Sequence, residues 1–403
     1  MNKPLKGVKV VDLTYFIAGP GTAKILADWG ADVIKVEPSF GDPGRKTGAT
    51  MTMPITNDIN PLYNTYNSNK RGLSLNLKSP EGIEILHKLL EKANVFVSSY
   101  RTGALKRLGL DYETLKERHP HLIWAQVNGF GDYGPAKDNP GFDTVAFWAR
   151  SGAMLDLVEK GTSPVNPIIG FGDATTSCSL AGGIAAALYE QLKTGKGQKV
   201  MVSLFGQAIW SASAAVASTQ FADEYQKTRK NAISPVINSY KCKDGKWIFL
   251  SILEHERYFA TLCELFHREE LCEASEYATS TESKKYAPQL IKILDDEIVK
   301  YTQDEVVEML TKADIAHERV QHIKDAVFDP QAIANNYVYE FTYRNNEKTM
   351  LASTPIKFND IEIGEVTVAP KIGEHGAEIL KELGYTDKEV EELLAREVLY
   401  IEK

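Results

Sequence analysis

The chain has 403 residues, of which 43% are hydrophobic and 25% charged, so it is long enough for one large domain and a smaller one. Its formal net charge of −8 argues against a nucleic-acid-binding protein, whose binding surface must be broadly basic. The four cysteines form no CxxC pair and the eight histidines no HExxH motif, so we expect free thiols, no bound metal and a reducing compartment.

The N-terminal residues 1–7 lack the long apolar stretch and the cleavage site of a secretory signal. No uninterrupted apolar run is long enough to span a bilayer. We therefore expect a cytoplasmic protein that engages no membrane.

The first third of the chain alternates strand and helix signals. Residues 8–13 and 31–37 are β-rich, and between them we expect a turn at 18–21 and a helix over 22–29. Ser79 and Pro80 are a helix start, with Ser at the N-cap and Pro at the first helical position. Further strands are expected at 72–77, 94–100 and 122–127, and a further helix at 112–118. This alternation predicts βαβ units, a parallel sheet and an α/β fold.

The second half begins with a long Ala-rich helix, expected over 175–192, and a strand at 199–204. After about residue 221 the composition becomes polar and charged. A hairpin is expected over 239–250, turning at Asp244-Gly245, and amphipathic helices follow to about residue 324. This change of character predicts a smaller α+β domain.

The first strand, turn and helix also resemble the start of a dinucleotide-binding fold, with Glu37 ending the second strand. That fingerprint requires a third small residue for close helix–strand packing, and Lys24 occupies its position. A Rossmann-like sheet is therefore expected, and a nicotinamide dehydrogenase is only a minority alternative.

Several segments together resemble the class III CoA-transferases, the family of formyl-CoA:oxalate, carnitine and phenyllactate CoA-transferases. The resemblance runs along the whole chain in the family's order and spacing. The segments that carry it are residues 5–12, 18–20, 26–37, 69–71, 78–82, 105–110, 172–173, 373–375 and 383–385.

The resemblance implies an enzyme that moves CoA from an acyl-CoA to a free carboxylic acid. It implies a Rossmann-like large domain built from residues 1–222 and completed by a return segment, 329–403, with a small α+β domain over 223–328 inserted between them. It also implies a homodimer whose two chains interlock like rings. CoA thioesters are then substrates, and no permanently bound cofactor is expected.

Asp173 is the nucleophile that the resemblance implies. From the residues alone, Gly172-Asp173 before a helical run is more simply an N-cap, although the two interpretations are compatible. A carboxylate at a helix N-terminus is expected to stay ionised, as nucleophilic attack on a thioester requires.

The resemblance also implies a CoA site. Phosphate groups need cations and exposed amides, and Lys78 and Arg107 match CoA-contacting positions. The remaining positions implied to contact CoA are Leu75, beside the adenine, and Ser99, Phe16 and Ala18. The chain departs from formyl-CoA transferases at Ser99, where they carry Asn, and at Pro38, where they carry a phosphate-contacting Arg.

Two further departures bear on the reaction. Phe142 stands where related acyl-CoA racemases have a catalytic His, and phenylalanine cannot take a proton. Residues 231–235 replace a glycine-rich flap of formyl-CoA transferases, which makes oxalate an unfavourable acceptor. Asp143 is either a polar support for the site or a turn residue.

Residues 99–105, 140–143 and 146–150 most resemble the branch acting on 2-hydroxy acids, such as 2-hydroxyisocaproate and phenyllactate, in amino-acid fermentation. The alternatives are a racemase or isomerase of the same fold, a transferase for carnitine, bile acid or oxalate, and a non-catalytic CoA-binding protein.

Overall fold

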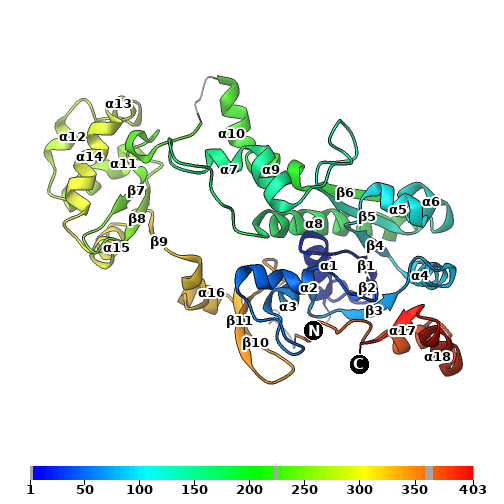
Figure 1. Ribbon diagram of the computed structural model, residues 1–403. Helices are drawn as coiled ribbons and strands as arrows, with labels where there is room; N and C mark the ends of the chain where they lie inside the picture. Colours follow the sequence, from blue (N-terminus) through cyan, green and yellow to red (C-terminus); the bar gives the residue numbers. More distant parts are fainter. Residues whose placement is uncertain (1–2, 222–224, 359–365, 403) are drawn as a thin grey trace. The chain divides into compact units, whose positions relative to one another are not determined.

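The computed structural model describes residues 3–221, 225–358 and 366–402 (Figure 1). The chain forms two compact units. The larger comprises residues 1–153, 166–216 and 327–403, and the smaller comprises residues 154–165 and 217–326. Residues 154–165 are held within the smaller unit by hydrogen bonds: Lys160 N–H donates to Lys227 O at 2.8 Å, and Arg229 N–H donates to the side-chain Oε2 of Glu159 at 2.9 Å.

The larger unit is built on a mixed sheet in the order β12-β3-β2-β1-β4-β5-β6. All neighbouring pairs are parallel except β12 with β3, so the predicted α/β class and parallel sheet are confirmed, with an antiparallel edge strand added. The strands are β1 (Lys9–Leu13), β2 (Asp32–Glu37), β3 (Arg71–Leu75), β4 (Val95–Ser98), β5 (Ile123–Asn128), β6 (Lys199–Ser203) and β12 (Leu399–Tyr400).

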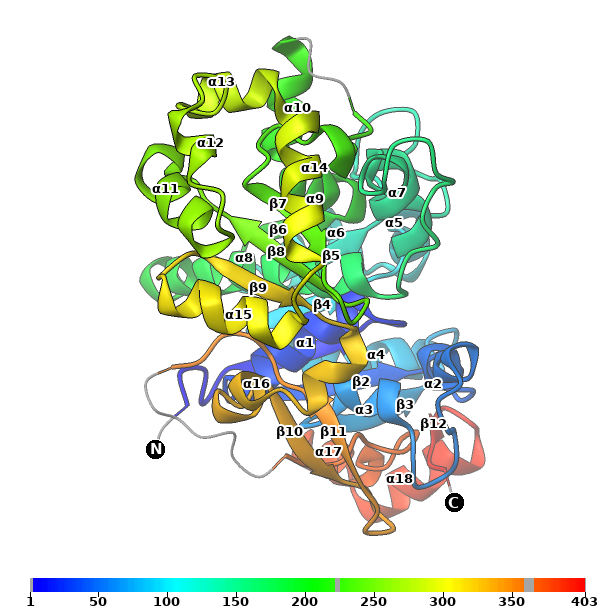
Figure 2. The ribbon, with the colours of Figure 1, turned by 90° about the vertical axis from the view of Figure 1, so that its left-hand side faces the viewer.

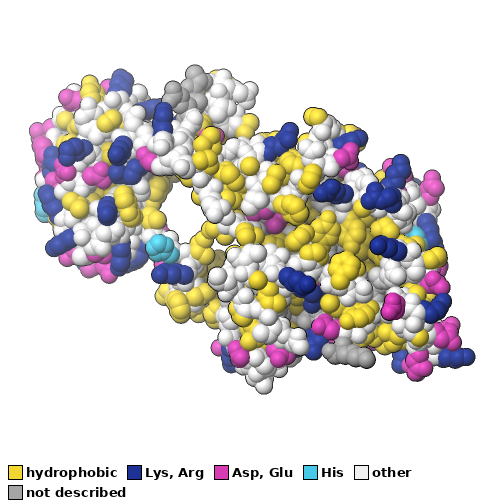
Figure 3. Space-filling model, in the orientation of Figure 1, with side chains coloured by type: hydrophobic (Ala, Val, Ile, Leu, Met, Phe, Trp, Pro, Cys, Tyr) yellow, Lys and Arg dark blue, Asp and Glu magenta, His cyan; other side chains and the backbone are white. Residues whose placement is uncertain are grey.

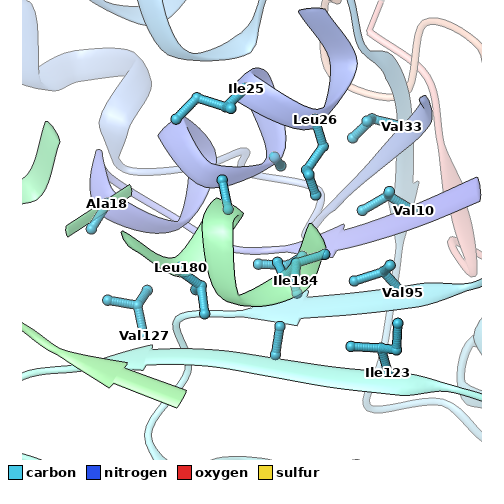
Figure 4. Close-up of a cluster of buried hydrophobic side chains, with 14 of the residues drawn as sticks. Val10, Ala18, Ile25, Leu26, Val33, Val95, Ile123, Val127, Leu180 and Ile184 are labelled. Carbon is cyan, nitrogen blue, oxygen red and sulfur yellow. The ribbon is translucent and has the colours of Figure 1, made fainter. Parts of the chain in front are cut away.

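Both faces of this sheet are buried. Side chains alternate between the two faces along each strand, so neighbouring residues of one strand pack in different hydrophobic clusters. Val10, Val95 and Ile123 pack on one face against helices α1 (Ala18–Asp28) and α8 (Phe171–Thr194) (Figure 4). Their neighbours Val11 and Phe96 pack on the other face with α4 (Pro80–Lys92).

Helix α1 begins earlier than predicted. The expected turn at residues 18–21 is wrong, because these residues form the first turn of the helix. Proline is tolerated there, since the first N–H groups of a helix have no intrahelical partner. Gly21 allows close packing on α8: a Cβ at that position would lie 2.5 Å from Ser177 Oγ. The glycines and the proline at the start of α1 therefore do not end the helix, and Gly21 lets it pack closely on α8.

The other helices of the larger unit surround this core. Helix α3 (Pro61–Asn67) lies beside the hairpin β10 (Val338–Thr342) and β11 (Lys348–Ala352) in both ribbon views (Figures 1 and 2). The remaining elements are α2 (Gly44–Thr47), η1 (Gly48–Met51), α5 (Thr102–Leu108), α6 (Tyr112–Arg118), the π-helix η2 (Asp143–Ala149), α9 (Leu204–Ser211), α16 (Pro330–Ala334), α17 (Gly376–Glu382) and α18 (Asp387–Ala395).

The smaller unit has its own core. The predicted hairpin is present as β7 (Ile237–Lys241) and β8 (Trp247–Ser251), and β9 (His317–Val320) joins it as a third antiparallel strand. Its helices are α11 (His255–Leu265), α12 (Glu270–Glu273), α13 (Ser280–Lys285), α14 (Ala287–Ile298) and α15 (Gln303–Lys312), with η4 (Arg229–Asn231). The elements α7 (Ala153–Asp156), α10 (Ser213–Ser218), η3 (Thr219–Phe221) and η5 (Ile323–Val327) lie at or near the points where the chain passes between units.

Charged side chains of both signs are interspersed on the face shown in Figure 3. Among the described helices, none combines the length and apolarity needed to cross a membrane.

The predicted start of α4 offers a test of local helix stability. Ser79 Oγ accepts a hydrogen bond from Gly82 N–H at 2.9 Å, as an N-cap should. Ser79→Ala is expected to lower the free energy of unfolding by about 1 kcal/mol, since it leaves a helical N–H group without a side-chain acceptor. Denaturant unfolding measures the loss, and Ser79→Asp, which keeps an acceptor, should restore most of it.

Candidate active site

A cleft opens at the carboxyl ends of β1, β4 and β5 and holds about 760 Å³ of space not filled by atoms. Its walls come from Tyr15 and Phe16 after β1, from Ser99 after β4 and from Gly129 after β5. Strands β1 and β4 are neighbours, but the chain leaves β1 toward β2 and reaches β4 only from β3. Ligand sites of open α/β sheets form at such a switch point.

The corner after β1 has an unusual backbone conformation. Phe16 has a φ of 66°, which side-chain-bearing residues rarely adopt. Its N–H donates to Asp42 Oδ1 at 3.0 Å, and Asp42 is paired with the fully buried Lys35 at 3.0 Å. Tyr15 N–H donates to Ser99 Oγ at 2.9 Å. The buried ion pair and Ser99 thus hold the two strand ends that form the cleft.

Asp173 also lines this cleft, but it is not the N-cap of its helix. Helix α8 begins at Phe171, four residues earlier than expected, and Gly170 with a φ of 84° occupies the N-cap position. The capping carboxylate comes from elsewhere in the chain: Gly170 N–H donates to Asp143 Oδ2 at 2.9 Å. Asp143, buried at the start of η2, is therefore a polar support for α8, and Asp173 is the third residue of the helix.

The two carboxylates influence each other. Burial and, to a smaller extent, the negative charge of Asp143 together raise the pKa of Asp173 to about 7. Burial also raises the pKa of Asp143, while the backbone N–H groups of Gly170, Gly172 and Asp173 oppose that rise. The helix terminus was expected to keep Asp173 ionised, but its N–H groups stabilise Asp143, so Asp173 is a carboxyl group that titrates near neutral pH.

Gly172 is required by the contact between α8 and η2. A Cβ at this position would lie 2.3 Å from both Phe147 Cγ and Asp143 Oδ1. The absence of a side chain therefore allows the capping carboxylate and the Phe147 ring to reach the first turn of the helix. The π-helical geometry of η2 is itself frequent at functional sites.

The residues predicted to bind CoA divide into two groups. Phe16, Ala18 and Ser99 line the cleft together with Asp173. Lys78 and Arg107 are exposed and follow β3 and β4, whose carboxyl ends lie at the same sheet edge, but neither lines the cleft. Leu75 is 1% exposed and packs in the hydrophobic core beside β12, away from the cleft.

Sequence reasoning missed two cations of the cleft. Arg101 and Lys137 are both exposed and line it. Arg101 directly precedes α5, just beyond the end of β4, so the rule that ligands bind at strand carboxyl ends could have identified it. Lys137 lies in the connection between β5 and η2, and no sequence signal marked it.

A second hollow of about 530 Å³ lies on the β2 side of the Tyr15-Phe16 corner. Its walls are mostly apolar and aromatic, including Pro38, Phe40 and Tyr100. Within the described ranges, no group of three or more His, Cys, Asp or Glu side chains could hold a metal ion.

The model of CoA-transferase family III matches residues 5–376. The chain belongs to this family. It is accordingly a transferase enzyme.

Named relatives of this CoA-transferase align along nearly its whole length. It is 42% identical to (R)-2-hydroxy-4-methylpentanoate CoA-transferase of Clostridioides difficile, covering 96% of this chain and 97% of the relative. It is 38% identical to cinnamoyl-CoA:phenyllactate CoA-transferase of Clostridium sporogenes, covering 96% and 95%. The crystal structure of a CAIB/BAIF family protein from Brucella suis matches with a TM-score of 0.80 and 27% identity, covering 95% of this chain and 100% of that one.

Proposed function

We propose that this CoA-transferase moves CoA from an acyl-CoA to a free 2-hydroxy acid, with Asp173 as the nucleophile. The observation that carries the proposal is the position of Asp173, a carboxyl group in the cleft at the strand ends, with Arg101 and Lys137 in the same walls. The names of the two bacterial relatives, both transferases for 2-hydroxy acids, support the choice of acceptor.

The proposed reaction proceeds through covalent intermediates on Asp173. A carboxylate oxygen attacks the thioester carbonyl, and the carbon–sulfur bond breaks, giving an acyl-aspartyl anhydride and CoA thiolate. The thiolate then attacks the aspartyl carbonyl, giving an aspartyl-CoA thioester and releasing the donor acid. The acceptor carboxylate attacks this thioester, a second anhydride forms, and the returning thiolate takes the acceptor acyl group and frees Asp173. Each intermediate is about as activated as a thioester.

Asp173 must be ionised to attack, so transfer should rise with pH through the pKa of Asp173, about 7. Asp143→Asn removes the negative charge that opposes this ionisation while an amide oxygen can still accept from Gly170 N–H. The acidic limb of the pH profile of kcat/KM is therefore expected to move to lower pH. Measuring kcat/KM between about pH 5 and 9 tests this; a limb that stays in place would contradict the proposed coupling of the two carboxylates.

For CoA itself, we propose that Arg101 and Lys137 contact its phosphates, in place of the arginine that Pro38 replaces. Lys78 and Arg107, exposed at the same sheet edge, are proposed as further phosphate contacts, and Ser99, Phe16 and Ala18 as wall contacts. The apolar hollow bounded by Pro38 and Tyr100 suits a planar base. Leu75 supports this region from within the core.

The acyl group is proposed to lie against aromatic rings. Phe142 is half-exposed and stands edge-on to Phe16, with ring centroids 5.5 Å apart. An apolar wall suits the side chain of a branched or aromatic 2-hydroxy acid and does not suit oxalate, which has no apolar part. A racemase would need a base at this position, which Phe142 does not provide.

We propose further that the two units act as a Rossmann-like large domain and an inserted small domain, and that two chains interlock as a homodimer in the cytoplasm. Exposed apolar side chains on the larger unit support self-association, among them Leu192 and Trp210, which are 85% and 74% exposed.

The experiment is an exchange assay on the purified protein. It is incubated with isocaproyl-CoA and a panel of free acids that includes 2-hydroxyisocaproate, phenyllactate, carnitine and oxalate, and new CoA esters are followed by mass spectrometry. A new ester with the 2-hydroxy acids supports the proposal. Exchange only with carnitine or oxalate would overturn the substrate, and α-proton exchange in heavy water without any new ester would indicate a racemase.

A further inference from the structure

Tyr66, on α3, lies close to the beginning of α8, because two glycines leave room for its side chain. A Cβ on Gly21 of α1 would lie 3.3 Å from Tyr66 Cδ1, and a Cβ on Gly170 would lie 3.8 Å from the Tyr66 hydroxyl oxygen. The phenol therefore lies beside the N-cap of the helix that carries Asp173.

The phenol is also within the electrostatic range of both carboxylates. Burial raises the pKa of Tyr66 to about 12, and the negative charges of Asp173 and then Asp143 contribute to the rise. Tyr66 consequently keeps its proton at neutral pH and can serve as a hydrogen-bond donor.

Neither group has a hydrogen-bond partner for its side chain among the described residues. The Tyr66 hydroxyl makes no such bond, whereas the hydroxyl of Tyr63, one turn earlier on α3, donates to Glu37. The Asp173 carboxyl group likewise receives no hydrogen bond from a described residue, although it lies in a helix N-terminus. A partly buried donor without an acceptor and a partly buried acceptor without a donor therefore lie near each other.

We propose that Tyr66 is a positioning residue: its hydroxyl, which makes no hydrogen bond to a described residue in this structure, donates one to the carboxylate of Asp173 when that group is ionised. The bond orients the nucleophilic oxygen and favours the charged form that attacks the thioester. The proton stays on Tyr66 throughout, so no proton transfer is involved. This role rests on the proposed nucleophilic function of Asp173.

The ionisation of Asp173 also depends on the other charged groups of the site. Asp143, from η2, opposes ionisation of Asp173. Arg101 and Lys137 line the cleft from α5's start and from the loop before η2. Because Tyr66 is neutral, its removal should change the titration of Asp173 only through the lost hydrogen bond.

The test is a titration that needs no substrate. Protein labelled with ¹³C at the aspartate Cγ is followed by NMR across pH, and Asp173→Asn identifies the signal of Asp173 by its loss. Tyr66→Phe is expected to raise the pKa of Asp173 by about one unit, the size of a hydrogen bond to a charged group. An unchanged pKa in Tyr66→Phe overturns the proposal.

Tyr343→Phe is the matched control. Tyr343 is a buried phenol whose hydroxyl has no hydrogen-bond partner in the described part of the chain. Burial is the cause that raises its pKa to about 12, without a contribution from a carboxylate. Tyr343→Phe should leave the pKa of Asp173 unchanged. An equal shift in this variant would mean that the loss of any buried hydroxyl changes the pKa of Asp173, which overturns the proposal.

The pH profile of transfer gives a second readout. A higher pKa leaves less of Asp173 ionised at low pH, so Tyr66→Phe should lose about tenfold in kcat/KM near pH 6 and little near pH 9. An equal loss at every pH with an unmoved titration would make Tyr66 a direct contact of the reacting group and overturn the positioning role. If the native protein transfers no CoA, the proposed function fails, while the NMR titration still decides the contact.

Discussion

Asp173→Asn is expected to reduce CoA transfer by at least about a thousandfold, because an amide cannot form the anhydride or the aspartyl-CoA thioester. The CoA transfer that remains should be only what the bound substrates undergo without an enzyme nucleophile. Mass spectrometry of the intact protein after incubation with acyl-CoA measures the covalent adduct, which is expected in the native protein and not in the variant.

The same variant should fold normally. Burial disfavours the charged form of Asp173, and its pKa of about 7 means that the carboxylate is an unfavourable charge in the folded protein above neutral pH. Removing the charge is expected to leave the melting temperature at about pH 8 unchanged or higher. A variant that transfers CoA at the native rate would show that another group is the nucleophile.

The second large effect is expected from a substitution at Gly172, in the first turn of the same helix. Gly172→Ala places a Cβ 2.3 Å from Phe147 Cγ and from Asp143 Oδ1, so the π-helix η2 must move or α8 must lose its cap. Such overpacking costs about 1–3 kcal/mol of stability, and displacement of Asp173 should reduce transfer by about a hundredfold. Thermal unfolding and the exchange assay measure the two losses.

Gly182→Ala is the matched control, because it adds the same methyl group to α8 at a position that contacts no other element. No atom lies within 4 Å of the Cβ that it adds, and the position is exposed in the interior of α8. Alanine is expected to stabilise the helix by about 0.5–1 kcal/mol and to leave transfer unchanged. If both alanine variants behave alike, the contact between Gly172 and η2 does not position Asp173.

The strands and the helix α4 could be predicted from local signals, because their causes lie within a few residues. The short, mostly apolar runs that form β1 to β5 are buried almost throughout, and the Ser79-Pro80 start caps α4, so both signals act within a few residues of the chain. The starts of α1 and α8 were predicted four residues late. In α8 the N-terminal N–H groups are capped by Asp143, which lies 27 residues before Gly170, and no local pattern encodes such a contact. In α1 the glycines and proline were interpreted as breakers because their packing partner, α8, lies about 155 residues further along.

The same distinction applies to the candidate site. The residues around Asp173, and the resemblance they carry, single out that carboxylate without any coordinates. Its chemical state could not be read in the same way, because burial and the charge of Asp143 set it, and both exist only once η2 packs on α8. The grouping of Arg101, Lys137, Ser99 and Phe16 around one cleft likewise depends on three strands ending at a common edge. Covalent chemistry is a property of residue types and their order, whereas a pKa and a binding surface depend on distances that only the folded chain determines.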